Sequence, residues 1–226
     1  MNARDSILAR LRAPRMPAAP ALPDVAGWFA AHRRVENLEQ RCQRLRTALE
    51  ASHAEVHDVG PTDWADRLLH IAAAKGLGTL LIGNGTPHGA MLEARAPADL
   101  KLVRYDRAIE AWRDQLFDAV DASLTLARSA IAETGTLVLW PSPAEPRLMS
   151  LVPPLHFVLL DAETVQADLD TVLRTEHWHD ALPTNALLIS GPSKTADIQQ
   201  TLAYGAHGPK ELVVLLRHAA NPGEGA

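Results

Sequence analysis

Residues 186–197, with the sequence ALLISGPSKTAD, combine residue types that bind anions. An apolar run typical of a buried strand breaks at Gly191-Pro192, and we expect a helix to begin there. A helix start offers unpaired backbone N–H groups, which here converge with two hydroxyls and an ammonium group. In an open parallel sheet such a point lies beyond the carboxyl ends of the strands, where ligands bind. We therefore predict a carboxylate or phosphate site that includes Gly191, Ser193, Lys194, Thr195 and Asp197.

The same residues also allow a plainer interpretation. Pro192 is favoured at the first position of a helix, and Ser193 or Thr195 can serve as an ordinary cap without any ligand. A phosphate-binding P-loop is disfavoured, because its spacing requires a glycine directly before the lysine and Ser193 stands there instead. The segment thus indicates either an anion site or a simple helix start.

A second candidate segment is AETGT, residues 132–136, which places a carboxylate on a tight turn before the apolar pattern TLVLW. Such a carboxylate can act as a nucleophile, a general base or a hydrogen-bond acceptor. A glutamate on a solvent-facing turn has the same pattern and needs no catalytic role. The candidate catalytic residue is Glu133. The candidate ligand-binding residues beside it are Thr134, Gly135 and Thr136.

Two further side chains complete the candidate site. Arg147 lies in a proline-rich loop, where its guanidinium can clamp a carboxylate or phosphate, pair with Glu145 or lie in water. His207 and Gly208 lie in a glycine-flanked turn, close in the chain to the anion-binding segment. A single loop histidine is more often structural or exposed, so its role stays open.

Other cofactor patterns are incomplete. The G-x-G-x-x-G pattern of dinucleotide-binding folds fails at His88, which stands in place of the third glycine. We considered zinc at His53 with His57, at His177 with His179, and at His207, but saw no accompanying cysteine or carboxylate at ligand spacing, so we predict no metal site. The G-x-S-x-G pattern of serine hydrolases is absent.

Composition narrows the function classes further. The 226 residues carry a net charge of -5 and only 4% aromatic residues, which argues against a surface for nucleic acid or an anionic membrane. No apolar run approaches the roughly 20 residues that cross a bilayer, so we expect a cytoplasmic protein. Cys42 is the single cysteine, and a cluster held by this chain alone usually needs four thiolates. We predict no cofactor in this chain and a core-packing role for Cys42.

The hydrophobic periodicity predicts an α/β fold with a mostly parallel sheet flanked by helices. The domain occupies residues 24–218, after a short helix at residues 6–12 and a proline-rich arm that together make up residues 1–23; residues 219–226 form a flexible tail. We expect helices at residues 35–51, 63–75, 107–117, 165–173 and 196–204. We expect strands at residues 79–82, 100–103, 120–126, 136–140, 155–160, 186–190 and 212–216.

Three blocks in this order, AETGT, PRLMSLVPPLHFVLL and SGPSKTADIQQTLAYGAHGPKELVVLL, resemble the C-terminal half of the lactate-utilization protein C family, which is the LUD domain. The resemblance covers residues 129–216. It implies a fold similar to that of CoA-transferases, ribose-phosphate isomerase and glucosamine-6-phosphate deaminase. One departure is Lys194, where arginine is expected in much of the family, so the charge persists without bidentate geometry.

The resemblance also implies a role in bacterial oxidation of L-lactate to pyruvate beside iron–sulfur partner proteins. With a small carboxylate bound at the GPSKT turn, this chain is then expected to be a non-redox subunit. Two alternatives remain at this stage. One is a stand-alone CoA-transferase-like or cyclo-ligase-like enzyme that uses Glu133, and the other is a regulator that binds a carboxylate metabolite.

Overall fold

The computed structural model describes residues 2–12, 21–196, 202–205 and 207–219. The chain divides into two units, one up to Arg33 and the other from Arg34 on. The first unit contains α1 (Ala3–Arg12) and α2 (Val25–His32), and none of the residues described in either helix is buried. The expected helix at residues 6–12 is thus part of a longer one. Within the described residues, no helix has the length and apolar character that a bilayer crossing requires.

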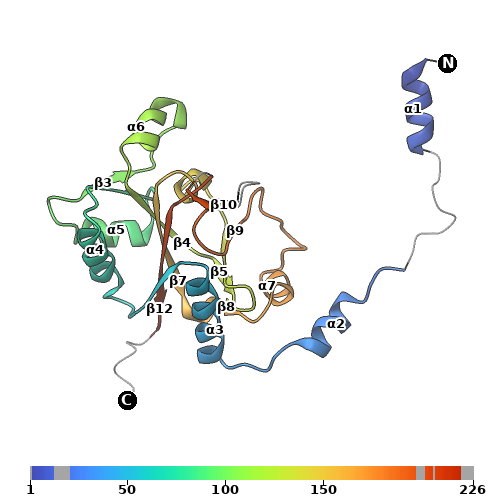
Figure 1. Ribbon diagram of the computed structural model, residues 1–226, viewed down its shortest axis with the longest axis horizontal. Helices are drawn as coiled ribbons and strands as arrows, with labels where there is room; N and C mark the ends of the chain where they lie inside the picture. Colours follow the sequence, from blue (N-terminus) through green and yellow to red (C-terminus); the bar gives the residue numbers. More distant parts are fainter. Residues whose placement is uncertain (1, 13–20, 197–201, 206, 220–226) are drawn as a thin grey trace. The chain divides into compact units, whose positions relative to one another are not determined.

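The second unit is built on a parallel sheet with the described strands in the order β1-β12-β7-β4-β2-β3 (Figure 1). Helices between successive strands return the chain so that neighbouring strands run in the same direction. The predicted α/β class with a mostly parallel sheet is therefore confirmed. The strands are β1 (Glu55–Val59), β2 (Thr79–Ile82), β3 (Lys101–Arg104), β4 (Ala122–Leu126), β7 (Leu155–Asp161) and β12 (Glu211–Arg217).

A second sheet covers part of one face of the parallel sheet. Its described strands have the order β8-β5-β6-β9, with antiparallel pairing on both sides of β6 and parallel pairing between β5 and β8. The apolar side chains of this sheet, of α3 and of the parallel sheet form one core cluster. The elements are α3 (Leu38–Ala51), β5 (Ser129–Ile131), β6 (Thr136–Leu139), β8 (Val165–Gln166) and β9 (Leu187–Ile189).

The second sheet is an addition that the sequence analysis did not anticipate. Strands β6 and β9 form where strands were predicted, but they belong to the second sheet. The sequence of β6 looks like that of a parallel strand, because a strand buried on both faces shows no alternation in either arrangement. The run in β9 is equally apolar in sequence, although Leu188 is exposed.

Helices cover the remaining surfaces of the parallel sheet (Figure 1). On the face opposite the second sheet, α4 (Trp64–Ala74) and α5 (Pro87–Glu93) pack their apolar residues on the strands. At the β3 edge a separate cluster includes Trp112 between the 3-10 turn η1 (Ile109–Ala111) and α6 (Arg113–Asp118). The remaining described elements are α7 (Leu169–Thr175) and the 3-10 turns η2 (Arg147–Ser150) and η3 (Ala162–Thr164).

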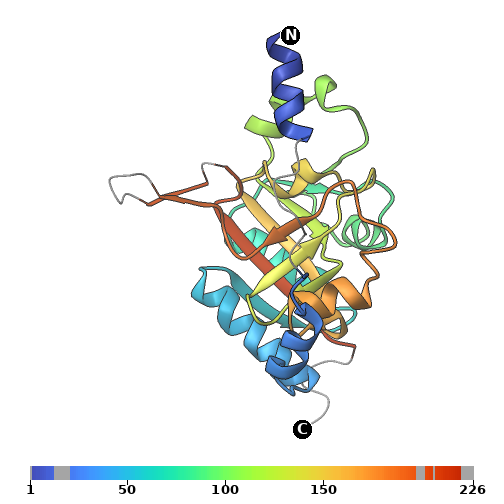
Figure 2. The same ribbon diagram turned by 90° about the vertical axis from the view of Figure 1, so that its right-hand side faces the viewer.

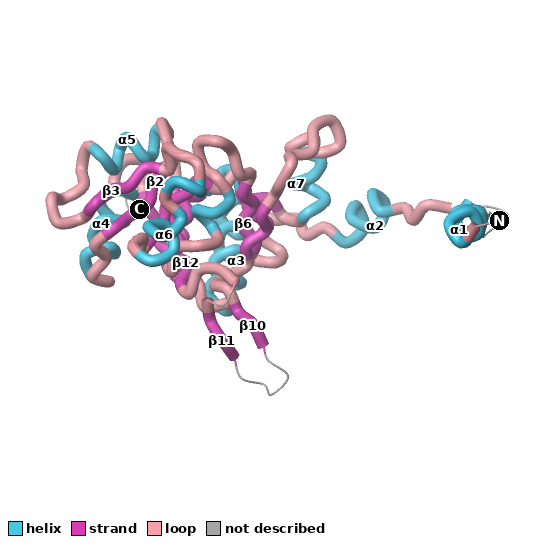
Figure 3. Tube along the Cα trace, turned by 90° about the horizontal axis from the view of Figure 1, so that it is seen from above, coloured by secondary structure: helices cyan, strands magenta, loops and turns pink. Residues whose placement is uncertain are grey.

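The helix predicted after Gly191 is not present in the described residues. Instead, β10 (Lys194–Ala196) pairs antiparallel with β11 (Leu202–Tyr204), and this hairpin projects from the rest of the unit (Figure 2 and Figure 3). Two backbone hydrogen bonds hold its base, from Ser193 N to the Pro209 carbonyl at 2.8 Å and from Gly205 N to the Ser193 carbonyl at 3.0 Å. Periodicity suggested a helix over 196–204, but pairing between the two segments gives strands. Gly205 therefore ends a strand and is not a helix cap.

Two of the predicted helices begin later in the structure than the sequence indicated. The helix expected from residue 35 begins at Leu38, because Asn37 and Gln40 form a capping box before it. The helix expected from residue 165 begins at Leu169, where Asp168 accepts a hydrogen bond from Thr171 N; the residues before it form β8. Capping side chains thus decide both starts, and hydrophobic spacing alone does not reveal them.

Gly135 joins β5 and β6 in a left-handed conformation, with φ of 61°, against α3. A Cβ there would lie 2.6 Å from the Ala48 Cβ and 3.0 Å from backbone atoms of α3. We predict that Gly135→Ala lowers the free energy of unfolding by about 1–3 kcal/mol more than Gly76→Ala does. Gly76 is the matched control, because its φ of 67° is similar but nothing lies within 4 Å of a Cβ there. Urea unfolding measures both variants, and equal losses would contradict the steric argument.

Cys42 lies in the core as predicted, with 6% of its surface exposed. Burial raises the pKa of its thiol to about 11, so at pH 8 only about one thiol in a thousand is ionised. We predict that the native protein reacts slowly with a disulfide reagent at pH 8, whereas the unfolded protein reacts rapidly with one equivalent. Rapid stoichiometric reaction of the native protein would show that the thiol is accessible.

Candidate functional site

A cavity of about 180 Å³ lies between the two sheets, at the base of the hairpin. Its apolar lining consists of Leu151, Leu188, Ile189, Pro209 and Leu212. Its polar lining consists of Ser150, His156, Ser190, Ser193 and His207. These side chains enclose a mixed environment in which neutral hydrogen-bonding groups face aliphatic walls. That combination is typical of a pocket for a small organic molecule.

The cavity lies at the amino-terminal end of the parallel strands. His156 and Leu212 are the second residues of β7 and β12, respectively. We predicted a site beyond the carboxyl ends of parallel strands, and the cavity is at the opposite edge. The reason is that the predicted segment follows β9, which belongs to the second sheet and has its own direction.

Four of the predicted site residues line this cavity together: Gly191, Ser193, His207 and Gly208. The hydrogen bond from Ser193 N to the Pro209 carbonyl brings their two segments into contact. Gly208 is packed closely there, since a Cβ on it would lie 3.1 Å from the Ser193 Cβ. The two segments thus meet at one cavity, and the hairpin strands β10 and β11 follow and precede them in place of the predicted helix start.

The AETGT turn is connected to the cavity lining by hydrogen bonds between hydroxyl groups. The buried Thr136 hydroxyl lies 2.8 Å from the hydroxyl of Ser190, which lines the cavity, and 2.7 Å from that of Thr134. Glu133 is exposed, and its backbone N–H donates to the Ala167 carbonyl at 3.1 Å. Glu133 is not among the residues that line the cavity. Gly135 packs on α3.

The other predicted residues lie outside the cavity lining. Arg147 is exposed at the start of η2, whose last residue, Ser150, does line the cavity. Glu145 does not pair with Arg147, since its carboxylate lies 2.6 Å from the His88 Nε2. Lys194 is exposed at the start of β10. Thr195 pairs with Ala203 in the hairpin ladder, and Asp197 lies outside the described residues.

His156 is the functional candidate that our sequence analysis missed. It is fully buried, and its Nε2 lies 2.8 Å from the Thr125 hydroxyl, whereas its Nδ1 has no hydrogen-bond partner among the described residues. Burial lowers the pKa of His156 to about 3, so the ring is neutral near pH 7. The available signal was a histidine inside the apolar strand LHFVLL, because buried strands seldom contain an ionisable residue without a partner.

A polar seam runs along β4 beside the cavity. The strand turns Ala122 and Leu124 to one face and Ser123 and Thr125 to the other, where Ser123 donates a hydrogen bond to the Met149 carbonyl. This seam separates the core cluster of the second sheet from the cluster near α6. His156, which contacts Thr125 of this seam, therefore lies between these two apolar clusters.

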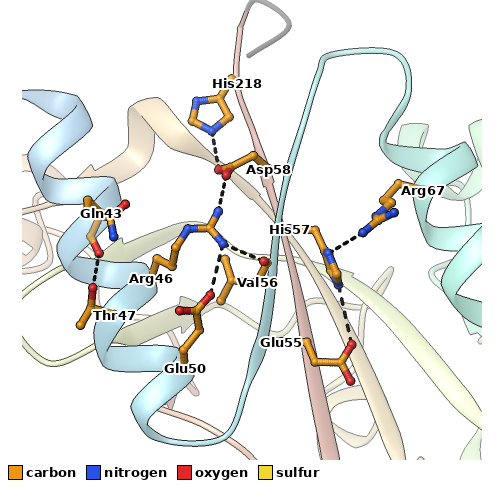
Figure 4. Close-up of polar contacts among 10 residues, drawn as sticks. All are labelled: Gln43, Arg46, Thr47, Glu50, Glu55, Val56, His57, Asp58, Arg67 and His218. Carbon is orange, nitrogen blue, oxygen red and sulfur yellow. Dashed lines mark hydrogen bonds and ion pairs between the residues drawn. The ribbon is translucent and has the colours of Figure 1, made fainter. Parts of the chain in front are cut away.

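A second polar cluster lies at the opposite end of the sheet (Figure 4). Arg46 of α3 donates to the Val56 carbonyl at 2.7 Å and also contacts Asp58, which in turn lies 2.9 Å from the His218 Nε2. Burial alone would raise the pKa of Asp58, but the hydrogen bonds from His218 and Arg46 lower it. These groups satisfy one another and tie α3 to β1 and to the end of β12. We interpret the cluster as structural.

On the other side of β1, His57 lies 3.0 Å from an Arg67 nitrogen and 3.7 Å from a Glu55 oxygen (Figure 4). Burial, followed by the nearby charge of Arg67, lowers the pKa of His57. From the sequence we considered His53 with His57 for zinc and predicted no metal site; neither residue belongs to the possible ligand cluster found among the described residues.

The histidines after α7 correct one step of the sequence argument. His177 and His179 are accompanied by a carboxylate, since the three potential ligand atoms of these residues and Asp180 lie within 4.8 Å of one another. All three side chains are exposed, and Asp180 lies 3.1 Å from the His179 Nε2. Paired charges of this kind are common on protein surfaces.

Comparison with known proteins relates the chain to one family. Residues 42–216 match the family model of the LUD domain. The chain is 38% identical to an uncharacterized protein of Neisseria meningitidis serogroup B over 95% of this chain and 93% of that protein. It is 34% identical to lactate utilization protein C of Halalkalibacterium halodurans over 41% of this chain and 42% of that protein.

The crystal structure of a DUF162 family protein from Deinococcus radiodurans has a similar fold. Its TM-score is 0.59 at 19% identity, and the similarity covers 81% of this chain and 99% of that one. At this identity the similarity is one of fold alone.

The buried neutral state of His156 predicts a pH dependence of stability. The pKa is lowered in the folded protein, so the unfolded protein binds more protons between about pH 6.5 and pH 3. The contribution is complete above pH 6.5 and is lost as the pH falls, by about 1.4 kcal/mol per unit below about pH 6. We predict that His156→Gln, which cannot titrate, has a shallower loss of stability between pH 7 and pH 4.5.

Urea unfolding at several pH values measures this difference. His207→Gln is the matched control, because His207 is exposed and lines the same cavity. It should keep the wild-type pH dependence. Parallel stability curves for wild type and His156→Gln would show that His156 titrates alike in the folded and unfolded states.

Proposed function

The chain belongs to the LUD-domain family, and from that premise we propose that it is a subunit of a bacterial L-lactate utilization system, which oxidises L-lactate to pyruvate. The match of residues 42–216 to the family model carries the proposal, because it includes every residue that lines the cavity. Relatives with the name lactate utilization protein C support the assignment to this process.

We propose that the cavity is the binding site for a small carboxylate such as lactate or pyruvate. Its volume of about 180 Å³ equals that of about six water molecules, at roughly 30 Å³ each. Leu188 and Leu212 offer apolar contacts for a short alkyl group, and the serine hydroxyls and the His207 imidazole offer hydrogen bonds. In this proposal the GPSKT turn contributes Gly191 and Ser193 to the site.

In this proposal the electrons from lactate travel through partner proteins. The chain has one cysteine, Cys42, and it is buried in the core, so this chain offers no thiolate set for an iron–sulfur cluster. Iron–sulfur lactate-utilization subunits would then carry the redox chemistry in the cytoplasm. This chain would bind the carboxylate and complete the complex.

Reconstitution tests the proposed function. The full chain is purified with and without the iron–sulfur lactate-utilization proteins of the same organism, and lactate-dependent dye reduction and co-purification are measured. The proposal predicts dye reduction only in the mixture, together with a stable complex. Turnover of a CoA or folate substrate by this chain alone would support the stand-alone enzyme with Glu133, and binding of a carboxylate without any complex would support a regulator.

A variant that fills the cavity tests the binding site. Leu188 lines the cavity but is 52% exposed, so Leu188→Trp can add bulk at the rim without disturbing the core. We predict at least a tenfold weaker binding of pyruvate by calorimetry, with an unchanged melting temperature. Leu182→Trp is the matched control, because Leu182 is 75% exposed and lies outside the cavity lining. Equal affinities of both variants would place the carboxylate elsewhere.

A further inference from the structure

Only one of the two ring nitrogens of His156 has a hydrogen-bond partner among the described residues. The side chain is fully buried, lines the cavity and uses only its Nε2, toward the Thr125 hydroxyl at 2.8 Å. The Nδ1 atom has no partner among the described residues. A buried polar atom without a partner destabilises the fold, so such atoms usually meet water or a ligand.

The partner of Nε2 decides which ring nitrogen carries the proton. Within the described residues, the Thr125 hydroxyl forms a hydrogen bond with His156 alone, and Thr125 is itself only 3% exposed. If Nε2–H donated to the hydroxyl oxygen, both the threonine hydrogen and the Nδ1 lone pair would be unsatisfied. If the hydroxyl donates to Nε2, only the Nδ1–H group is left. Because the second arrangement buries fewer unpaired groups, it places the proton on Nδ1.

The sheet holds this donor in position. Thr125 lies on β4 and His156 on β7, and these neighbouring parallel strands align Ser123 with His156 and Thr125 with Val158. The hydrogen bond between the two side chains thus joins residues of adjacent strands whose backbones are already fixed. A donor held in this way loses little conformational freedom when a ligand binds, which favours tight and oriented binding.

The cavity lining limits the chemical class of the atom that meets His156. It contains no lysine or arginine among the described residues, so a carboxylate buried beside His156 would lack a countercharge. An uncharged oxygen, such as a carbonyl or hydroxyl oxygen, accepts from a neutral imidazole without that cost. Exposed His207 and Ser193, which is half-buried, lie on the part of the lining formed by the hairpin base.

We propose that the Nδ1–H group of His156 donates a hydrogen bond to the uncharged oxygen at C2 of a short 2-oxo or 2-hydroxy acid. The carboxylate of that acid then lies toward Ser193 and His207, and its alkyl group lies against the leucines. This assignment rests on the proposed function of the cavity. It adds the ligand class, the orientation of the ligand and the residue that recognises it.

The tautomer is tested first, without any ligand. Nitrogen NMR of the full, uniformly labelled chain distinguishes a protonated from an unprotonated ring nitrogen, and the spectrum of His156→Gln identifies the signals of His156. We expect a neutral ring with the proton on Nδ1 at pH 7. A proton on Nε2, or a charged ring, would overturn the proposal whatever the protein's function is.

Two substitutions then test recognition, with pyruvate as the probe in calorimetry. The amide of asparagine reaches the position of Nδ1, whereas that of glutamine reaches the position of Nε2. We expect His156→Asn to bind pyruvate within about threefold of wild type and His156→Gln to bind at least tenfold more weakly. Circular dichroism and the melting temperature establish that each variant is folded.

The outcomes separate this proposal from the proposed function. Equal binding by wild type and both variants would overturn the role of His156 while leaving the carboxylate site intact. Absence of pyruvate and lactate binding to the wild-type chain would overturn the ligand class. Lactate-dependent reduction in the reconstituted mixture is measured independently, so a subunit role can stand when the ligand assignment fails.

Discussion

Polar groups between the two sheets must be satisfied without bulk water, and this constraint explains the arrangement around the cavity. The parallel sheet, α3 and the second sheet share one apolar cluster. Along β4, Ser123 finds its partner in the Met149 carbonyl and Thr125 finds its partner in His156 of the neighbouring strand β7. His156 satisfies only one of its two nitrogens in this way, and it does so at the wall of a cavity. A ligand bound in the cavity could therefore supply the hydrogen bond that this nitrogen lacks.

The base of the hairpin forms part of the cavity wall, at one end of the space between the two sheets. This base is joined by the hydrogen bond from Ser193 N to the Pro209 carbonyl, so the chain before β10 and the chain before β12 meet there. Gly191, just before Ser193, packs on the end of α3: its φ is 147°, and a Cβ there would lie 2.8 Å from the Ser52 carbonyl oxygen, so a side chain does not fit. The candidate site therefore depends on the pairing of β10 with β11, because this pairing brings together the two chain segments that flank the hairpin.

Much of the fold was predictable because long apolar runs and helix punctuation are local signals. The strand at residues 79–82 and the helix ending near Gly76 follow from residue type and spacing alone. The edge strand β1 was missed because its sequence, EVHDV, is largely polar and its two buried valines lie three residues apart, which does not fit the period of two that indicates a strand. The division into two sheets was also missed, because the direction in which an apolar strand pairs is a property of the whole fold and not of its residues.

The candidate site was only partly predictable for the same reason. Gly191, Ser193, His207 and Gly208 were identified from glycine, hydroxyl and imidazole groups close in the sequence. The helix start assumed for them was wrong, since strand pairing overrides the helical spacing of residues 196–204. His156 was not identified because its significance lies in what surrounds it, namely Thr125 on a neighbouring strand and a cavity on the other side.

A crystal structure of the full chain with pyruvate tests the central claim most directly, because it locates the ligand and its orientation together. The account predicts pyruvate in the cavity between the sheets, with its C2 oxygen at hydrogen-bond distance from the His156 Nδ1 and its carboxylate toward Ser193 and His207. Pyruvate bound at any other place, or a cavity that holds only water at saturating pyruvate, would contradict it.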